Sequence, residues 1–338
     1  MAVITKTHDM EDFASTHELH LALGYFDGLH LGHQALLERT LSLAGERGGE
    51  PGVLLLDPHP QKVLGGNGGF RNLNTLDEKI RMIRAFGDIH IFILSFDLDL
   101  ARLSPEAFVR DYLVGLLRIK SAVCGYNYRF GHKGQGNSGS LERMGETYRF
   151  GCCVLPQVTD RGNPVSSTEI RRLIESGAMY EAYSRLGHVH VFTGNVIDGQ
   201  KLGSRLGFPT ANLALDAELL WPAYGVYGGF VRIDDGAVYQ GIINAGIRPT
   251  VNQAGGAPSF EIFLTDFHED LYGRKLQAVL TDRLRPEKAF DSVGTLKAQI
   301  SRDVTGAGSA LSEWEKRLRN AGESPESIFA CVFKRDSI

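Results

Sequence analysis

Residues 23–33 of the chain read LGYFDGLHLGH, and they follow Leu19–Leu23, an apolar segment with the composition of a buried strand. Apolar residues then recur at roughly helical spacing over residues 35–44. We therefore predict a strand, a glycine-containing turn and a helix. At such a junction an α/β sheet offers an anion free backbone N–H groups and the positive end of a helix dipole.

Glycines and histidines make this turn suitable for phosphate. Gly24, Gly28 and Gly32 lack the side chains that would keep a polyphosphate away from the backbone. His30 and His33 lie on either side of Gly32, and imidazoles can donate to oxygens whose charge grows during group transfer. A tight turn whose histidines only cap the helix is the simpler alternative.

Length and composition favour a two-domain protein of the cytoplasm. A chain of 338 residues is too long for one ordinary domain. A formal net charge of −4 argues against a broad nucleic-acid surface. The cysteines lack Cys-x-x-Cys spacing, which favours reduced thiols over a disulfide framework or a zinc site; they are Cys124, Cys152, Cys153 and Cys331. No signal-type core and no run of about 18–20 apolar residues is evident, so we expect no membrane span.

Strands and helices alternate from residue 19 to about residue 186. The predicted strands are Leu19–Leu23, Val53–Leu56, Ile89–Leu94, Ser121–Cys124 and Cys152–Leu155. The predicted helices are His33–Arg47, Asp77–Phe86, Pro105–Leu117, Glu169–Glu175 and Met179–Leu186. This pattern predicts a doubly wound, Rossmann-like parallel sheet as a first domain, residues 1–186, with ligands beyond the carboxyl ends of the strands.

The pattern changes after residue 187, where strand-like segments follow one another with turns between them. They are His188–Ile197, Val226–Ile233, Val238–Asn244, Ser259–Leu264 and Leu276–Leu284. We predict a small antiparallel β-barrel as a second domain, residues 187–306, closed by a helix at Ser292–Val304. A Gly-Ala-Gly break then predicts a separate, peripheral helix, Leu311–Asn320, within a partly helical extension, residues 307–338.

Two further motifs of the first domain follow predicted strands. Asp57–Pro60 (DPHP) presents His59 on a rigid turn. The loop at residues 125–131 (GYNYRFG) contains Asn127, and it offers aromatic rings for a flat ligand and Arg129 for a phosphate. A surface turn and an aromatic loop that only packs are the alternatives.

A third motif is SSTEIR at residues 166–171. Hydroxyl groups before a helix are ordinary N-caps, which accounts for at least one of Ser166, Ser167 and Thr168. Arg171 in the first turn is disfavoured by the helix dipole. An anionic ligand resolves this conflict, and an ion pair with Glu175 is the alternative.

The second domain carries two candidate phosphate or metal elements. A glycine-rich segment that includes Gly199, Lys201 and Gly203 suits either a phosphate loop or a barrel hairpin. In the following PTAN sequence, Thr210 and Asn212 project together if the segment is extended, and they offer two hard oxygens to Mg²⁺. An Asx-type turn is the alternative.

One carboxylate of the second domain is unusual. Glu261 lies inside an apolar strand, SFEIFL at residues 259–264, where desolvation is costly unless the carboxylate has a role or a partner. A glutamate at the edge of the sheet that faces solvent is the alternative.

Taken in order, these motifs resemble one enzyme family. The sequence FDGLHLGH at residues 26–33, the DPHP turn, the 125–131 loop and SSTEIR resemble the adenylyltransferase module of prokaryotic bifunctional riboflavin kinase/FAD synthetases. PTAN at residues 209–212, with further matches at 225–227, 244–250, 270–273 and 290–292, resembles riboflavin kinases. Leu56 and Tyr128 stand where the family usually has Phe, and neither change removes a polar group.

For the first domain, the resemblance implies AMP transfer from ATP to the phosphate of FMN, which gives FAD and pyrophosphate. His30, His33 and Arg171, together with Mg²⁺, then stabilise charge on the phosphates. The implied ATP- and flavin-binding residues are Gly24, Phe26, Asp27, Gly28, Gly32, His59, Asn127, Arg129, Ser166, Ser167 and Thr168.

For the second domain, the resemblance implies ATP-dependent phosphorylation of riboflavin to FMN. The 5′-hydroxyl must lose a proton, so a general base is expected, and Glu261 falls at the family's position for it. The implied ATP- and flavin-binding residues are Gly199, Lys201, Gly203, Pro209, Thr210, Asn212, Asn244 and Arg248, with Mg²⁺ at Thr210 and Asn212.

Riboflavin, FMN and ATP are therefore the expected partners, and self-association or contact with flavoprotein clients stays open. Two other functions are conceivable. One is an adenylyltransferase acting on another phosphorylated acceptor, and the other is a flavin-binding carrier or regulator with degenerate catalysis. The intact polar residues at His30, His33, Arg171, Thr210, Asn212 and Glu261 argue against degeneration.

Overall fold

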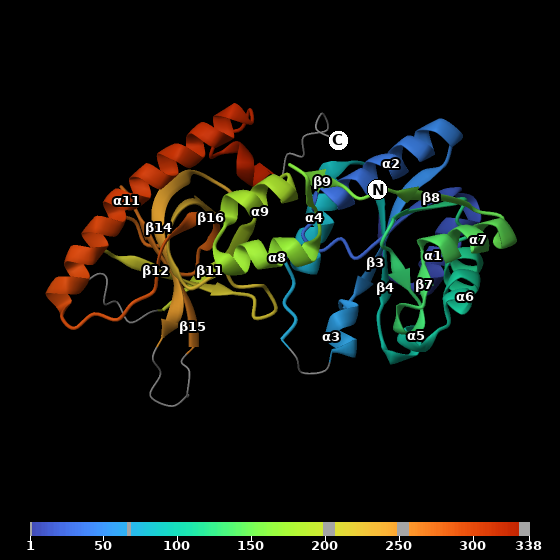
Figure 1. Ribbon diagram of the computed structural model, residues 1–338, viewed down its shortest axis with the longest axis horizontal. Helices are drawn as coiled ribbons and strands as arrows, with labels where there is room; N and C mark the ends of the chain where they lie inside the picture. Colours follow the sequence, from blue (N-terminus) through green and yellow to red (C-terminus); the bar gives the residue numbers. More distant parts are fainter. Residues whose placement is uncertain (1, 66–68, 199–206, 249–256, 331–338) are drawn as a thin grey trace. The chain divides into compact units, whose positions relative to one another are not determined.

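The computed structural model describes residues 2–65, 69–198, 207–248 and 257–330 (Figure 1). They form two compact units, of which the first ends at Ser167 and the second begins at Thr168. No helix in these segments is long and apolar enough to cross a membrane. Cys124, Cys152 and Cys153 are free thiols.

The first unit is built on a six-stranded sheet in the order β1-β4-β3-β2-β5-β8, and every neighbouring pair is parallel. The strands are β1 (Val3–Ile4), β2 (Leu19–Leu23), β3 (Glu50–Asp57), β4 (His90–Ser95), β5 (Ser121–Gly125) and β8 (Gly151–Leu155). The predicted doubly wound parallel sheet is confirmed. The strand order reverses between β2 and β5, and the carboxyl ends at such a reversal are where α/β sheets bind ligands.

Helices cover both faces of this sheet. They are α1 (Thr7–Thr16), α2 (Leu31–Arg47), α3 (Pro60–Leu64), α4 (Leu76–Phe86), α5 (Leu98–Arg102), α6 (Pro105–Phe108), the π-helix η1 (Val109–Leu116), the 3₁₀ turn η2 (His132–Gly134) and α7 (Ser138–Tyr148). Leu19, Leu21 and Leu23 point to one face, where they join a buried cluster with Met10 of α1 and Leu141 of α7. Figure 1 shows α1, α6 and α7 together on that side. Helix α2 packs on β2, β3 and β5 and contributes nothing to this cluster, so it covers the other face.

Some local elements differ from expectation. The predicted helix Pro105–Leu117 is α6 continued by the π-helical turn η1. Helices α1 and α7, each of which buries only two residues, lie outside the helices expected from the sequence. Short two-residue strands also occur in loops, namely β6 (Arg129–Phe130) with β7 (Gly136–Asn137), and β9 (Thr159–Asp160) with β10 (Asn163–Pro164).

The second unit is a closed antiparallel barrel in the order β11-β12-β15-β14-β13-β16, with β16 pairing back to β11. Its strands are β11 (Val191–Ile197), β12 (Thr210–Leu215), β13 (Gly225–Ile233), β14 (Val238–Arg248), β15 (Ala257–Leu264) and β16 (Lys275–Pro286), and helices α8 (Ser167–Ser176) and α9 (Met179–Leu186) precede them. The predicted barrel is confirmed. Closure leaves no open edge, so every strand has a neighbour on both sides.

A single long helix, α11 (Val293–Asn320), packs against β13, β14 and β16. The prediction of a break after Val304 and a peripheral second helix is wrong. The helix runs through Gly306 and Gly308, and beyond them Trp314 and Leu318 are buried against the barrel. Each helical glycine costs about 1 kcal/mol relative to alanine, which burial of these large side chains outweighs. The short turn η3 (Ser327–Ala330) follows α11.

Candidate functional sites

The two predicted histidines lie together at the start of α2. His30 is the N-cap residue of the helix, and its Nδ1 accepts a hydrogen bond from the His33 backbone N–H at 3.3 Å. The two rings stack with their centroids 3.7 Å apart and their planes inclined by 13°. A Cβ atom at Gly32 would lie 3.1 Å from the His30 ring, so a side chain there would crowd this ring. Glycine at this position therefore preserves the histidine pair.

His33 is held as a neutral ring with a free polar atom. Its Nδ1 is buried and has no hydrogen-bond partner, and its ring lies 5.0 Å from that of Phe26. Burial lowers the pKa of His33 well below its usual value, and the nearby His30 and Lys79 lower this pKa further. Buried polar atoms are normally satisfied, so an orphaned nitrogen beside a helix N-terminus suits a ligand oxygen.

The turn before the histidines has an unusual backbone. Phe26, Gly28 and Leu29 have φ angles of 50°, 84° and 39°. Glycine adopts this left-handed region easily, but other residues rarely do, and both Phe26 and Leu29 are fully buried. Such backbone persists only where the surroundings enforce it, and it is concentrated at ligand clamps.

The contacts of Asp27 help to hold this left-handed backbone in place. Its carboxylate accepts hydrogen bonds from the backbone N–H groups of Leu73 at 3.1 Å and Asn74 at 3.4 Å, and Nζ of Lys79 lies 3.6 Å away. The backbone carbonyl of Asp27 accepts a hydrogen bond from the Ser167 hydroxyl at 2.9 Å. Two predicted residues, Asp27 and Ser167, are thus brought together. The described contacts of the Asp27 carboxylate anchor the turn, and its contact with nucleotide stays a prediction.

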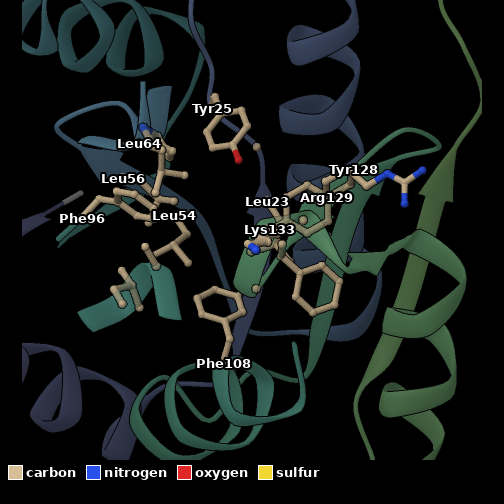
Figure 2. A pocket seen from close by; sticks show the side chains of 17 residues that line it. Leu23, Tyr25, Leu54, Leu56, Leu64, Phe96, Phe108, Tyr128, Arg129 and Lys133 are labelled. Carbon is tan, nitrogen blue, oxygen red and sulfur yellow. The ribbon is translucent and has the colours of Figure 1, made fainter. Parts of the chain in front are cut away.

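An apolar cavity of about 130 Å³ opens beyond the carboxyl ends of β2 and β3. Figure 2 shows Leu54, Phe108 and Tyr25 approaching it from separate elements. Tyr128 also lines the cavity, and burial raises the pKa of its hydroxyl well above the usual value. The remaining lining residues are Leu23, Gly24, Leu56, Pro60, Leu64, Phe96, Leu100, Ala101, Arg129, Phe130, Gly131, Lys133 and Gly134. Such a cavity suits a flat, largely apolar ring.

The other residues predicted for the first site lie at the cavity wall, on an exposed loop, or on or just before α8. His59 caps α3 by accepting from Gln61 N–H at 3.2 Å, and its ring lies 4.9 Å from that of Tyr25 at the cavity wall. Asn127 is exposed on the loop after β5. Ser166 is half-buried at the end of the first unit, whereas Thr168 and Arg171 belong to the second unit on α8. The approach of Thr168 and Arg171 to the histidine pair stays a prediction.

The barrel aligns three polar residues across neighbouring strands. Glu261 on β15 pairs in register with Asn212 on β12 and with Asn244 on β14. Directly opposite residues of an antiparallel pair have Cβ atoms about 4.5–5.5 Å apart, on the same face. Because β15 lies between two strands, Glu261 is not at a sheet edge, and its side chain is half-buried.

Two residues of this row, Glu261 and Asn244, border a second cavity, of about 290 Å³. Thr210, Asn244 and Glu261 contribute the polar groups predicted from sequence, and Leu296 and Ile300 of α11 contribute apolar ones. The other lining residues are Phe208, Val226, Ile242, Phe263, Arg285, Glu287, Lys288, Phe290 and Asp303. Aromatic rings beside a carboxylate suit a flat ligand that carries a hydroxyl group.

An ion pair fixes the helix over this cavity. Nε and Nη2 of Arg285 donate to the two carboxylate oxygens of Asp303 at 2.9 and 2.7 Å. Gln299 also donates to Asp303, at 2.8 Å. A bidentate pair of this kind joins α11 to β16 with a defined geometry.

The PTAN residues fit a magnesium ion. Asn212 is buried, and its Oδ1 has no hydrogen-bond partner. Thr210 lies two residues away on the same strand and so projects to the same face. Within the described ranges no group of three His, Cys, Asp or Glu side chains could hold a metal. Mg²⁺ prefers oxygen ligands and usually keeps several waters and substrate phosphates, so these two side-chain oxygens could supply the protein's share of its ligands.

Part of the predicted kinase site cannot be placed. Gly199, Lys201 and Gly203 lie outside the described residues, and Arg248 is the last residue of β14. Pro209 is exposed immediately before β12.

One residue near the histidines was missed from sequence. Lys79 shares the apolar face of α4 with Met82, Ile83 and Phe86, and only 7% of it is exposed. A lysine at i with apolar residues at i+3, i+4 and i+7 was the available signal, since lysine is almost never buried without a partner.

Comparisons with known proteins match the two halves of the chain to two different protein families. A family model described as FAD synthetase matches residues 12–169, and one described as riboflavin kinase matches residues 186–311. The bifunctional riboflavin kinase/FMN adenylyltransferase of Listeria monocytogenes is 35% identical over 84% of this chain and 89% of its own length. The enzyme of the same description from Escherichia coli K12 is 35% identical over 84% of this chain and 90% of its own length.

One solved structure has the same fold as this chain over nearly all of both chains. It is a Streptococcus pneumoniae crystal structure described as a macrolide-efflux protein, with a TM-score of 0.79 and 28% identity, covering 90% of this chain and 98% of that one.

Proposed function

The chain belongs to the family of bifunctional riboflavin kinases/FMN adenylyltransferases, and we propose here how its residues divide the two reactions. The enzyme phosphorylates riboflavin to FMN and then transfers AMP from ATP to FMN, which yields FAD and pyrophosphate. The observation that carries the proposal is that each compact unit contains its own site. The His30–His33 pair lies in the first unit, and Glu261 with its strand neighbours Asn212 and Asn244 lies in the second.

In the first unit, an oxygen of the FMN phosphate attacks the α-phosphorus of ATP, and the bond from that phosphorus to the pyrophosphate oxygen breaks. The attacking phosphate is ionised near neutral pH, so no general base is needed. His30 and His33 donate to oxygens whose negative charge grows. The role of Arg171, on α8, as a further cation stays a prediction from the sequence. The flavin ring occupies the apolar cavity lined by Tyr128.

In the second unit, the 5′-hydroxyl of riboflavin gives its proton to Glu261, and the oxygen attacks the γ-phosphorus of ATP as ADP leaves. Glu261 suits this role because it lines the cavity beside Asn244 and Thr210. Mg²⁺, which Thr210 and Asn212 would hold, neutralises phosphate charge when bound. The flavin ring lies among the aromatic side chains under α11.

The proposed domain limits are residues 1–186 for adenylyl transfer, 187–306 for the kinase and 307–338 for the extension. The start of the riboflavin kinase match at residue 186 supports the first limit. We also propose a cytoplasmic location, where the free thiols of Cys124, Cys152 and Cys153 stay reduced. A carrier with degenerate catalysis, or transfer to another acceptor, has no comparable support, since both family matches occur in one chain.

Product analysis tests this function. We expect the chain, supplied with riboflavin, ATP and Mg²⁺, to form FMN first and FAD afterwards. Formation of neither product would favour a carrier, and FMN alone would limit catalysis to the second unit.

A further inference from the structure

Lys79 is a buried cation that the proposed reaction does not yet use. Its side chain is 8% exposed and that of Asp27 is 1% exposed, and Nζ lies 3.6 Å from Oδ1 of Asp27. Burying a lysine and an aspartate is costly unless each compensates the charge of the other. The pair therefore has a defined partner geometry inside the first unit.

The pair acts on the part of the chain that presents the histidines. Asp27 lies between Phe26 and Gly28, whose backbones are both left-handed, and Leu29 repeats this conformation one residue before His30. The Asp27 carboxylate also accepts the N–H groups of Leu73 and Asn74. The Asp27 carboxylate thus joins the turn that precedes His30 to the residues just before α4.

We propose that Lys79 is a positioning residue for adenylyl transfer. Its buried ion pair with Asp27 holds the turn from Phe26 to Leu29 in the left-handed backbone that aims His30 and His33 at the nucleotide. This inference rests on the proposed adenylyltransferase function of the first unit, and it adds a residue that does not itself touch substrate.

The charge of Lys79 also reaches the histidine pair. Two titratable groups in the described part of the chain act on His33, namely His30 at the start of its helix and Lys79 on α4, and Asp27 is the ion-pair partner of Lys79. Positive charge on Lys79 disfavours protonation of His33, so it lowers the pKa of that ring. Removing the charge of Lys79 should therefore raise the pKa of His33.

The test compares Lys79→Met, which keeps volume but removes charge, with Lys79→Arg, which keeps charge. Arg84→Met, at an exposed position on the same helix, is the matched control. Riboflavin phosphorylation by the same full-length preparations serves as an internal control. We expect Lys79→Met to lower kcat for FMN adenylylation by about 100-fold, since misplacement by 1 Å can cost that much. Lys79→Arg should restore most of this rate, and Arg84→Met should leave it unchanged.

The pH profile adds a second readout. In Lys79→Met, the acidic limb of the adenylylation rate should move to higher pH, because His33 has lost a neighbouring positive charge. A folded Lys79→Met variant with the parent kcat and the parent profile would overturn the proposal.

A double variant covers the case in which Lys79→Met fails to fold. Asp27→Asn/Lys79→Met removes the unpaired buried charge and should restore folding while adenylylation stays slow. A folded double variant with the parent kcat would overturn the proposal. Failure of the unsubstituted chain to form FAD from FMN would instead overturn the proposed function.

Discussion

The imidazole rings of His30 and His33 stack 3.7 Å apart, and Nδ1 of His30 accepts the His33 backbone N–H. In a neutral ring whose Nδ1 accepts a hydrogen bond, the proton resides on Nε2. His30 therefore presents Nε2–H as its donor, and two rings this close disfavour double protonation. His33, whose pKa is lowered by burial, is thus a neutral ring beside the helix N-terminus.

Removal of either ring should slow adenylyl transfer specifically. We expect His30→Ala and His33→Ala to lower kcat for FMN adenylylation by about 10²–10³-fold, as for loss of a transition-state donor. Riboflavin phosphorylation in the same samples should be unaffected, and His8→Ala, at an exposed histidine, is the control. Near-parent FAD formation by His33→Ala, measured by chromatography, would contradict the assignment.

Acidification should destabilise the first unit through His33. Its folded-state pKa lies well below the usual value of about 6.5, so below pH 6.5 the unfolded chain binds more protons than the folded chain. The stability contribution is complete above pH 6.5 and is lost as the pH falls toward the folded-state pKa. In denaturant unfolding at pH 8 and pH 5.5, His33→Gln should lose less stability than the parent. Equal losses would show that His33 is not the group responsible.

Tyr128 should contribute to flavin binding through its ring. Tyr128→Ala removes an aromatic wall of the first cavity, so we expect the KM for FMN to rise about tenfold while the KM for ATP changes little. Tyr128→Phe keeps the ring and should behave like the parent. Equal increases in both KM values would argue that the cavity does not hold the flavin.

The unbroken helix α11 predicts stabilisation at two of its exposed glycines, Gly306 and Gly308. A Cβ atom at Gly306 or Gly308 would meet no other atom within 4 Å, and neither has a left-handed backbone. Gly306→Ala and Gly308→Ala should each raise the free energy of unfolding by about 0.5–1 kcal/mol. Gly228→Ala is the contrasting control, because its Cβ would lie 3.1 Å from Thr281 Oγ1 and 3.3 Å from Leu311. No gain at the first two positions would mean that the helix is broken there in solution.

Sequence reasoning located the histidine turn because its signals are local. The apolar strand, the glycines and the two histidines lie within fifteen consecutive residues, Leu19–His33. The Gly-Ala-Gly segment gave a wrong prediction, because it too was judged on local signals alone. Its low helix propensity predicted a break in the helix, but burial of Trp314 outweighs that propensity.

Relationships between distant segments were less accessible from sequence. The Asp27–Lys79 pair joins positions 52 residues apart, and nothing local indicates the partner of either residue. The register that places Glu261 between Asn212 and Asn244 depends on closure of the barrel. Glu261 itself could be identified from the sequence, because a carboxylate in an apolar strand is costly to desolvate unless it has a partner or a functional role.

The central claim, two independent sites in one chain, is tested most directly by mixing two variants. From riboflavin, ATP and Mg²⁺, His33→Ala should stop at FMN and Glu261→Gln should form no product, while Glu269→Gln, at an exposed carboxylate, should form both products. An equimolar mixture of the first two should form FAD, because FMN released by one variant is adenylylated by the other. A mixture of folded variants that forms no FAD, or a Glu261→Gln variant that fails to adenylylate supplied FMN, would contradict the account.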